Sequence, residues 1–444
     1  MATGNLSPSS ISIASARFST GKIIIAAISR LLLLSTILFS CGTSSESEQP
    51  AANADTLADS TVDIATDLNV DTADSEGNEL LETLKLGTVT TDNTGRSEFL
   101  SITVPEDAVS FSINVVGSPG VFFAVDALRD PNDKQIVFED WYSSPLNGKQ
   151  PSVCVICMNR IASGERAHSI LVPNTPAVEL VPGVYSFRIY AFMQGGSVFQ
   201  PEFSPAVGQA EVSAVIKRSP TGPPKFGVIN MNLHFTGAGG FNASNAPTNS
   251  RLKSALKTFA TIYASAGIGI GKLTYRDIDE SYQVVDGFSG AGNDFETIAK
   301  LTAGNPPGIN LIFVRELIAA SGPGFGIILG ISGGIPGPTG IQGTGRSAVF
   351  ISTESPEGPG ASENDLIGAT MAHETGHFLG LFHSSELGFG TQQLHDHLVD
   401  TPENDLNNLM YYNSTSGGTE LTESQAFVLR NNPWVEAPPN GVSP

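Results

Sequence analysis

The sequence predicts an α+β protein, in which an all-β domain is followed by a domain of alternating strands and helices. Between residues 85 and 218, short runs of alternating apolar and polar residues are separated by turn residues, which is typical of antiparallel sheets. From about residue 225 onward, strand-like runs alternate with helical periodicity, which favours a largely parallel sheet. Glycine (47) and proline (28) are plentiful, and only 15% of residues are charged. This composition suits sheet-rich and loop-rich folds better than helical bundles.

The first forty residues are typical of a secretory signal. They hold three basic residues and no acidic one, and the apolar run LLLLSTILF follows Arg30. Residues 38–41 (LFSC) resemble the lipobox of bacterial lipoproteins. The resemblance implies a signal peptide over residues 1–40, a lipid on Cys41, and export to the bacterial outer membrane or cell surface. The alternatives are an ordinary signal peptide or an anchor helix, and Arg30 disfavours a spanning helix because it breaks the longer apolar stretch.

Residues 41–84 are predicted to form a disordered acidic tether. From Gly42 to Leu84 there is no Lys or Arg, but there are eleven acidic residues among Ser, Thr, Ala and Asn. Such a segment cannot bury enough apolar surface to offset the entropy of ordering. We expect it to hold the folded part away from the membrane.

Residues 85–218 are predicted to be a β-sandwich. Four alternating runs are expected to be strands, at 99–104, 110–116, 121–125 and 185–192. The segment PGVYSFRI at 182–189 resembles the closing strands of bacterial pre-peptidase sandwich modules. The linker RSPTGPP at 218–224 marks the expected domain boundary.

The region 225–435 is predicted to alternate strands and helices. The expected strands are 226–235, 268–278, 309–314 and 346–352, and the expected helices are 249–266 and 295–301. A long Gly/Pro-rich segment at 321–345 contains the apolar stretch 325–331. An irregular segment of this length is more often functional than accidental, with plain surface looping as the alternative.

The charge of the chain argues against nucleic acid as a partner. The formal net charge is −21, and the sequence offers no basic patch that could neutralise phosphates. About half of this charge lies in the acidic tether, so the folded part is only mildly acidic.

Residues 373–383 read HETGHFLGLFH, a pattern with metal-ligand spacing. On a helix, His373 and His377 lie one turn apart on the same face, so both imidazoles can reach one ion. Glu374 projects near that face without being needed as a ligand. Gly380 can end the helix in a left-handed conformation, so that His383 returns to supply a third nitrogen. Three neutral imidazoles leave one position open, which is typical of catalytic zinc.

This pattern resembles the zinc signature of the metzincins, a class of zinc metallopeptidases. Residues 408–412 (NLMYY) are the candidate for the methionine turn of that class, and LTESQAFVLR at 421–430 resembles its C-terminal helix. Residues 395–402 (HDHLVDTP) look most like the pappalysin branch, although Tyr411 stands where that branch commonly has Asp. The resemblance covers about residues 225–435.

The resemblance implies a mixed five-stranded sheet above an active-site helix running from about residue 364 to 380. Residues 325–331 would form the antiparallel edge strand, beside which an extended peptide could pair. Met410 would pack beneath the histidines, and Tyr412 could stabilise the oxyanion or act as an extra ligand. Glu374 would be the general base of a zinc endopeptidase that cleaves protein or peptide substrates, with no covalent intermediate.

Several other residues allow both a functional and a simpler interpretation. His395 and His397 are either partners of the site or exposed loop residues, and three acidic residues are candidate calcium ligands, namely Asp396, Asp400 and Asp405. Cys154 and Cys157 form either a local disulfide or two ordinary thiols, with a thiolate that caps the zinc as a third alternative.

Two other functions compete with the endopeptidase. One is a surface-anchored binding module that keeps zinc as structure, against which Glu374 speaks, because a structural site has no need of that carboxylate. The other is a zinc amidase that acts on cell-wall peptides, which the sequence leaves open because the loops decide substrate choice.

Overall fold

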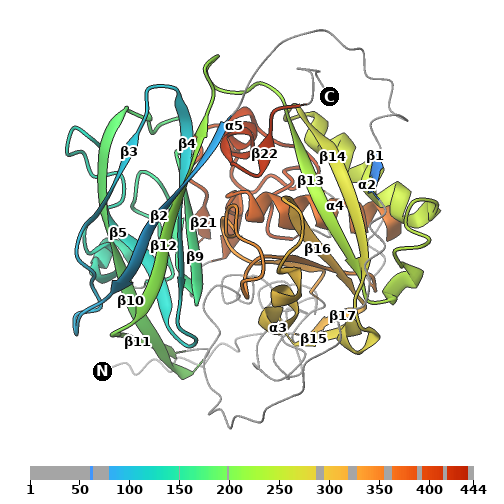
Figure 1. Cartoon of the computed structure of the whole chain (residues 1–444), viewed down its shortest axis with the longest axis horizontal. Helices are drawn as coiled ribbons and strands as arrows, with labels where there is room; N and C mark the ends of the chain where they lie inside the picture. The colour runs from blue at the N-terminus through green and yellow to red at the C-terminus, as the bar shows by residue number, and fades with distance from the viewer. Residues whose placement is uncertain are drawn as a thin grey trace, which may run out of the picture.

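The computed structural model describes residues 61–63, 80–149, 151–197, 200–286, 295–318, 328–354, 363–387, 393–413 and 418–438. These residues form two lobes side by side, a sandwich-like lobe of strands and a lobe that contains both strands and helices (Figure 1). The fold is therefore α+β and rich in sheet, as predicted. The predicted signal peptide and the lipid site at Cys41 lie outside the described residues.

The first lobe consists of two antiparallel sheets. One has the order β2-β12-β4-β9, with bounds Leu80–Thr90, Gln209–Arg218, Ala108–Gly117 and Ala167–Val172. The other has the order β11-β10-β5-β8, with bounds Gln200–Pro205, Gly183–Ser197, Phe122–Arg129 and Gly164–Glu165, and β3 (Leu100–Val104) also pairs with β10. A small pair, β6 (Val153–Cys154) and β7 (Ile161–Ala162), lies apart. All four predicted strands are present.

Strand β4 is buried on both of its faces. Its apolar residues Phe111, Ile113 and Val115 belong to the core between the sheets. Its polar residues alternate with them and are also buried, because they face the second lobe. Ser110 Oγ donates to the carbonyl of Asn431, and Asn114 Nδ2 donates to the carbonyl of Thr339 at 2.8 Å. The period-two pattern thus marks an interface between lobes rather than a solvated face.

The second lobe contains a mixed seven-stranded sheet. Its order is β1-β14-β13-β16-β19-β18, and β22 pairs with β13. Strands β14, β13, β16 and β19 run parallel, whereas β18, β1 and β22 are antiparallel to their neighbours. The bounds are Thr61–Asp63 (β1), Gly227–Phe235 (β13), Ile268–Asp277 (β14), Ile309–Val314 (β16), Gly330–Ser332 (β18), Val349–Ser352 (β19) and Val435–Glu436 (β22).

The sheet has two more strands than the five that were predicted. Both β1 and β22 are very short, and each exists because a neighbouring strand offers free backbone groups, which no local pattern reveals. Strand β1 also corrects the prediction of a disordered tether over 41–84, as does the first part of β2. Leu84 packs against the sandwich core, so the alternating run that forms β2 begins inside the range assigned to the tether.

Helices cover this sheet and lie close to their predicted positions. α2 (Ser250–Ala264) begins after Asn249, whose side chain accepts hydrogen bonds from the N–H groups of Arg251 and Leu252. It packs on α4 (Glu363–Phe378), where a Cβ at Gly368 would lie 2.5 Å from the carbonyl oxygen of Ala255. The two shorter helices are α3 (Phe295–Ala299) and α5 (Glu423–Asn431). Two strand pairs complete the lobe, β15 (Val284–Asp286) with β17 (Glu316–Ile318) and β20 (Ser385–Leu387) with β21 (Gln393–His395).

The predicted antiparallel edge strand is present, shifted along the chain. It was expected at 325–331, and the structure has β18 at Gly330–Ser332, paired with β19. Residues 325–327 lie outside the described part. The irregular residues that follow β18 pack between the lobes. Gly337 N–H donates to the carbonyl of Phe378 in the second lobe at 2.9 Å, and Thr339 N–H donates to Oδ1 of Asn114 in the sandwich at 3.0 Å. This half of the Gly/Pro-rich segment is therefore an interface rather than a free surface loop.

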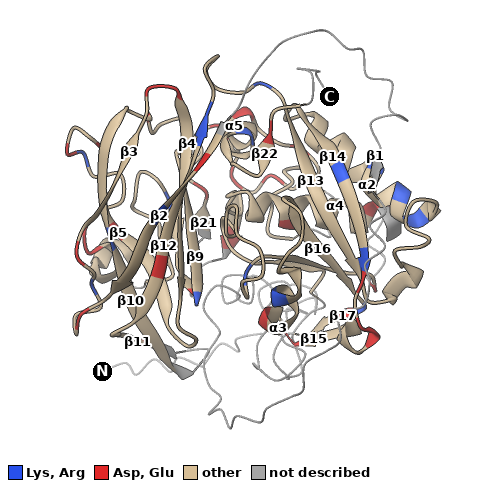
Figure 2. Ribbon diagram, viewed as in Figure 1, with Lys and Arg blue, Asp and Glu red and all other residues tan. Residues whose placement is uncertain are grey.

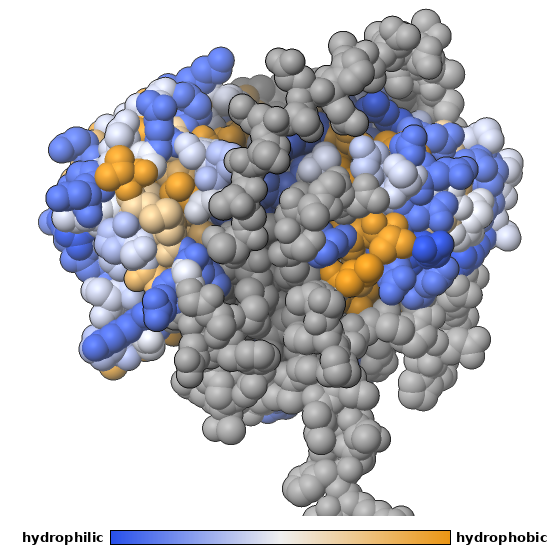
Figure 3. Space-filling view, turned by 90° about the horizontal axis from the view of Figure 1, so that it is seen from below, coloured by the Kyte–Doolittle hydropathy of each residue, from blue (hydrophilic) through white to orange (hydrophobic). Residues whose placement is uncertain are grey.

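The described surface mixes charges and exposes apolar residues on both lobes. Acidic and basic residues are interspersed over both lobes (Figure 2). Seen from below, apolar residues gather on the second lobe, and others lie on the sandwich (Figure 3). None of the helices in the described part is long and apolar enough to cross a membrane.

Candidate metal centre

Helix α4 and the turn after it bring three histidines together. His373 and His377 lie one turn apart near the end of α4. Gly380 has a φ of 111°, a conformation that glycine adopts at little cost. The chain turns back here, with Leu381 N–H donating to the carbonyl of Gly376 at 2.9 Å. His383 then joins the other two, as the spacing predicts.

Each of the three imidazoles is held by a hydrogen bond from its Nδ1 atom. His373 Nδ1 lies 2.7 Å from the carbonyl oxygen of Leu409, and His377 Nδ1 lies 2.7 Å from that of Leu381. His383 Nδ1 lies 2.8 Å from Oε2 of Glu386. A carbonyl or carboxylate oxygen can only accept, so each Nδ1 is the donor. In the neutral ring the Nε2 atom then keeps its lone pair.

The three Nε2 lone pairs meet at one point. His383 Nε2 lies 3.1 Å from Nε2 of His377 and 3.3 Å from Nε2 of His373. A tetrahedral zinc ion with bonds of about 2.0–2.1 Å separates its nitrogen ligands by about 3.3 Å. Burial lowers the pKa of His373 to about 3 and that of His377 well below its usual value, so these two rings are neutral near pH 7. The arrangement can hold a metal ion, and within the described residues no other group of side chains does so.

Glu374 lies beside the histidines and is 4% exposed. Burial raises the pKa of its carboxyl to about 8, and a hydrogen bond from the N–H of Ser332 acts in the opposite direction. A dication on the adjacent histidines would favour the carboxylate and lower this pKa. Its Oε2 atom is buried and has no protein partner. One carboxylate oxygen is therefore bonded to β18, while the other has no protein partner.

Gly330 permits this contact between β18 and α4. A Cβ at this position would lie 2.4 Å from Cγ of Glu374 and 2.9 Å from Cγ2 of Thr370. No other residue type fits here without moving the glutamate. The sequence pattern did not indicate this requirement for glycine.

The predicted methionine turn lies under α4. Met410 is fully buried, and a Cβ at Gly376 would lie 2.8 Å from its Sδ atom. The turn is fixed by Asn408 and Gln425, whose side-chain amides exchange two hydrogen bonds of 3.0 Å. The ring of Tyr412 packs on that of Tyr411, with centroids 4.7 Å apart. The role of Tyr412 beside a metal stays a prediction.

The weaker candidates lie outside the histidine cluster. His395 hydrogen-bonds Ser385 Oγ at 2.8 Å, and His397 Nε2 lies 2.9 Å from Oδ1 of Asn174 in the sandwich. The carboxylate of Asp400 accepts from the N–H of Ser424 at 2.9 Å, at the start of α5. The other two candidate calcium ligands, Asp396 and Asp405, accept backbone hydrogen bonds from Leu398 and Asn407. Calcium binding stays a prediction.

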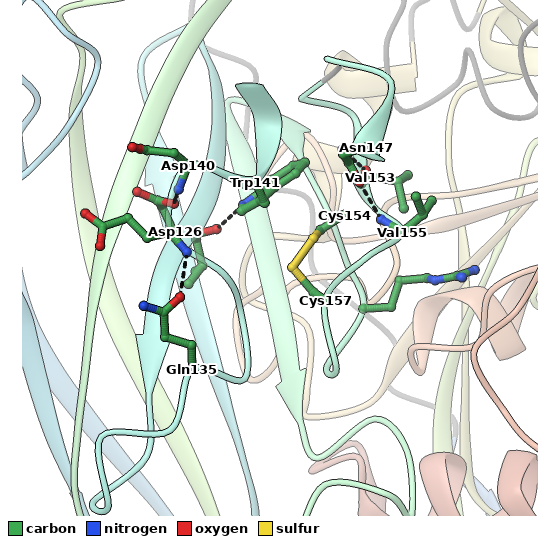
Figure 4. The surroundings of a disulfide bond; sticks show 12 residues. Asp126, Gln135, Asp140, Trp141, Asn147, Val153, Cys154, Val155 and Cys157 are labelled. Carbon is green, nitrogen blue, oxygen red and sulfur yellow. Dashed lines mark hydrogen bonds between the residues drawn. A yellow bond between two sulfur atoms is a disulfide. The ribbon is translucent and has the colours of Figure 1, made fainter. Parts of the chain in front are cut away.

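Cys154 and Cys157 form a disulfide inside the sandwich. Figure 4 shows it beside Trp141, with Asn147 bonded to the backbone of Val153 and Val155. A local disulfide was one of the three alternatives. Because the two sulfur atoms are bonded to each other, the alternative in which a thiolate caps the metal is wrong.

Sequence reasoning missed Glu386 as a partner of the third histidine. The available signal was an acidic residue three positions after His383, in a segment without helical periodicity. Metal-binding histidines commonly donate their second nitrogen to such a carboxylate.

Comparisons with known proteins add little. No family model matches the chain, and no curated protein matches it. An active-site mutant of a family two carbohydrate esterase from Clostridium thermocellum is 6% identical over 53% of this chain, with a TM-score of 0.14, and the match spans 65% of that protein. The matched chain in a structure of infectious bursal disease virus, Gx strain, is 12% identical to this chain over 41% of each, with a TM-score of 0.16. A family two carbohydrate esterase from Cellvibrio japonicus is 7% identical over 55% of this chain and 81% of its own, with a TM-score of 0.14. Similarity this low shows nothing about the activity of this chain.

Proposed function

We propose that this chain is a zinc-dependent endopeptidase of the metzincin type. The observation that carries the proposal is the convergence of three Nε2 atoms, 3.1 Å and 3.3 Å apart, beside a buried glutamate with one unpartnered oxygen. Three nitrogen donors at this separation suit zinc better than magnesium or calcium. The zinc signature, the antiparallel edge strand β18 and the buried Met410 under α4 support the same class.

Each residue of the site would have a distinct role. His373, His377 and His383 would hold the ion through Nε2, and their Nδ1 hydrogen bonds would fix the rings. A bound zinc ion supplies Lewis acidity, which lowers the pKa of water and polarises a carbonyl. Glu374 Oε2 would accept a proton from the attacking water and return it to the leaving amine. No serine or cysteine nucleophile is needed.

The edge of the sheet supports a peptide as the substrate. Strand β18 is the last strand beyond β19, and it lies directly on Glu374. A peptide that extends the sheet at β18 would bring its carbonyl groups close to the general base. The lipid anchor at Cys41 and the location on the bacterial surface remain part of the proposal.

The free oxygen of Glu374 favours an enzyme over the structural-zinc alternative. A closed structural site uses four protein ligands, whereas a cluster of three histidines leaves one position for water. The amidase alternative uses the same residues on a smaller substrate. Casein zymography, with and without a chelator and alongside cell-wall peptides, separates the three. Clearing of casein that the chelator abolishes supports the endopeptidase, and clearing that is indifferent to the chelator overturns it.

A further inference from the structure

Arg160 of the sandwich reaches the segment that carries the third histidine. It directly precedes β7, in the turn that joins β6 to β7 and contains the Cys154–Cys157 disulfide. The neighbouring Asn159 fixes this turn, since its Nδ2 donates to the carbonyl of Leu171 at 2.9 Å and its Oδ1 accepts from Asn174 N–H at 3.0 Å. The guanidinium therefore extends from a rigid support.

Two contacts join this guanidinium to the residues around the metal centre. Its Nη1 donates to the carbonyl of His395 at 2.8 Å. Its Cζ lies 5.5 Å from the centre of the Phe382 ring. Phe382 directly precedes His383 in the chain. Burial lowers the pKa of this guanidinium, and the charges of Asp396 and Glu386 act in the opposite direction. Glu386 is the residue whose Oε2 accepts from His383 Nδ1 at 2.8 Å.

The segment between these contacts forms a small hairpin. Strands β20 and β21 pair Ser385 with His395, so the carbonyl held by Arg160 lies opposite the strand that carries Glu386. In Figure 1, β21 lies between the sandwich and α4. A second bond from the sandwich, between Asn174 and His397, holds the end of the hairpin at 2.9 Å. The hairpin is thus fixed from the sandwich side as well as by the turn after α4.

We propose that Arg160 is a positioning residue for the third metal ligand, which makes the sandwich part of the metal centre. Its hydrogen bond to the carbonyl of His395 fixes β21, and β21 pairs with the strand that carries Glu386, so the Glu386 side chain stays aimed at His383 Nδ1. That hydrogen bond in turn directs the His383 lone pair to the metal. Arg160 touches neither metal nor substrate, so its effect runs through Glu386. This inference rests on the metal site of the proposed function, although not on peptidase activity.

The test measures zinc affinity in the full-length chain by competition with a chromophoric chelator. We expect Arg160→Met to weaken zinc binding by about tenfold to a hundredfold, the range typical of partners of metal-binding histidines. Arg160→Lys keeps the charge but loses the planar fork, so it should lie between Met and the parent. Arg129→Met is the matched control. It removes a sandwich arginine that pairs with Asp133 at 2.9 Å, and its affinity should equal that of the parent.

A double-mutant cycle tests the route through Glu386. Glu386→Gln keeps an acceptor for His383 but removes the charge that Arg160 faces. If Arg160 acts through Glu386, the double variant should bind zinc about as weakly as the weaker single variant. Affinity losses that multiply, or parental affinity in Arg160→Met, overturn the proposal. If Arg160→Met does not fold, Arg160→Lys decides: a loss of about threefold or more supports the proposal, and parental affinity overturns it.

The same experiment separates this inference from the proposed function. A parent that binds zinc but cleaves nothing overturns the endopeptidase and leaves the result for Arg160 standing. A parent that binds no zinc overturns both.

Discussion

The Nε2 atoms of His377 and His383 lie 3.1 Å apart, while the Nδ1 atom of each ring is bonded to an oxygen. The two Nδ1 atoms donate to Leu381 and Glu386, which directs both lone pairs to the same point. Two lone pairs that face each other at this distance repel unless a cation lies between them. The backbone and Glu386 therefore arrange the rings in the form that a metal requires.

The first prediction concerns the third ligand. We expect one tightly bound zinc per chain in the parent and a loss of that zinc in His383→Ala, because two imidazoles alone bind weakly. Metal analysis after dialysis measures the content. His168→Gln is the control, since its ring is buried in the sandwich, where it accepts from Val125 N–H at 3.3 Å, and this variant should retain one zinc. Full occupancy in His383→Ala would remove that residue from the site.

The sequence predicted the parts of the fold that local patterns determine. β16 has the predicted bounds 309–314, and α2 begins after the Asn249 cap. Spacing alone also indicated that His373, His377 and His383 could meet. These features depend on residues close together in the chain, where periodicity and capping act directly.

The remainder depends on contacts between distant residues. Arg160 and His395 are 235 positions apart, and the hydrogen bond between them follows from how the lobes pack. The alternation in β4 predicted a strand but not the partner of its polar face, because alternation is the same whether that face meets water or another domain. The sequence did not distinguish Gly330 from the other glycines, because its role depends on the packing of β18 against Glu374.

A second prediction follows from that close approach. Gly330→Ala places a Cβ where only 2.4 Å is available to Cγ of Glu374, so the carboxylate or β18 must move. Because small misplacements of catalytic groups are costly, we expect peptidase activity to fall by about tenfold or more with zinc content unchanged. Gly195→Ala in β10 is the control, since nothing lies within 4 Å of the added carbon. Parental activity in Gly330→Ala would show that the contact does not matter.

A third prediction concerns acid stability. His168 in β9 is fully buried and accepts a hydrogen bond from Val125 N–H at 3.3 Å, and burial lowers its pKa from 6.5 to about 3. The unfolded chain binds a proton there between these values while the folded chain does not. Stability is therefore lost as pH falls from about 6.5 toward 3, by about 1.4 kcal/mol per pH unit for one proton.

The variant His168→Gln isolates this effect. Glu165 and Asp396 shift in the opposite direction, since burial raises the pKa of each to about 7, so the slope of the parent alone is a sum. Urea unfolding between about pH 4 and 6 should show a slope lower by about one proton in the variant. Equal slopes would mean that His168 is protonated in the folded protein.

A fourth prediction tests the lipid anchor. Cys41→Ser removes the thiol that would be acylated, so the protein should leave the membrane fraction when its signal peptide has been cleaved. Membrane fractionation of cells that express the parent and the variant measures this. Peptidase activity should be the same in both, because the metal site contains no part of this segment. Continued membrane association of the processed variant would refute the lipid anchor.

The last prediction concerns Glu374, because it separates an enzyme from a binding module. In Glu374→Gln the zinc should stay bound, since the three imidazoles supply the ligands and glutamine is nearly isosteric. The variant lacks the group that takes a proton from water and returns it to the leaving amine. General acid–base catalysis is worth roughly 10²–10⁴ in rate, so activity should fall by at least about a hundredfold. Zinc content and the melting temperature, measured alongside a peptide-cleavage assay, should change little. If the variant cleaves as fast as the parent, Glu374 is not the base, and the mechanism proposed for this site is wrong.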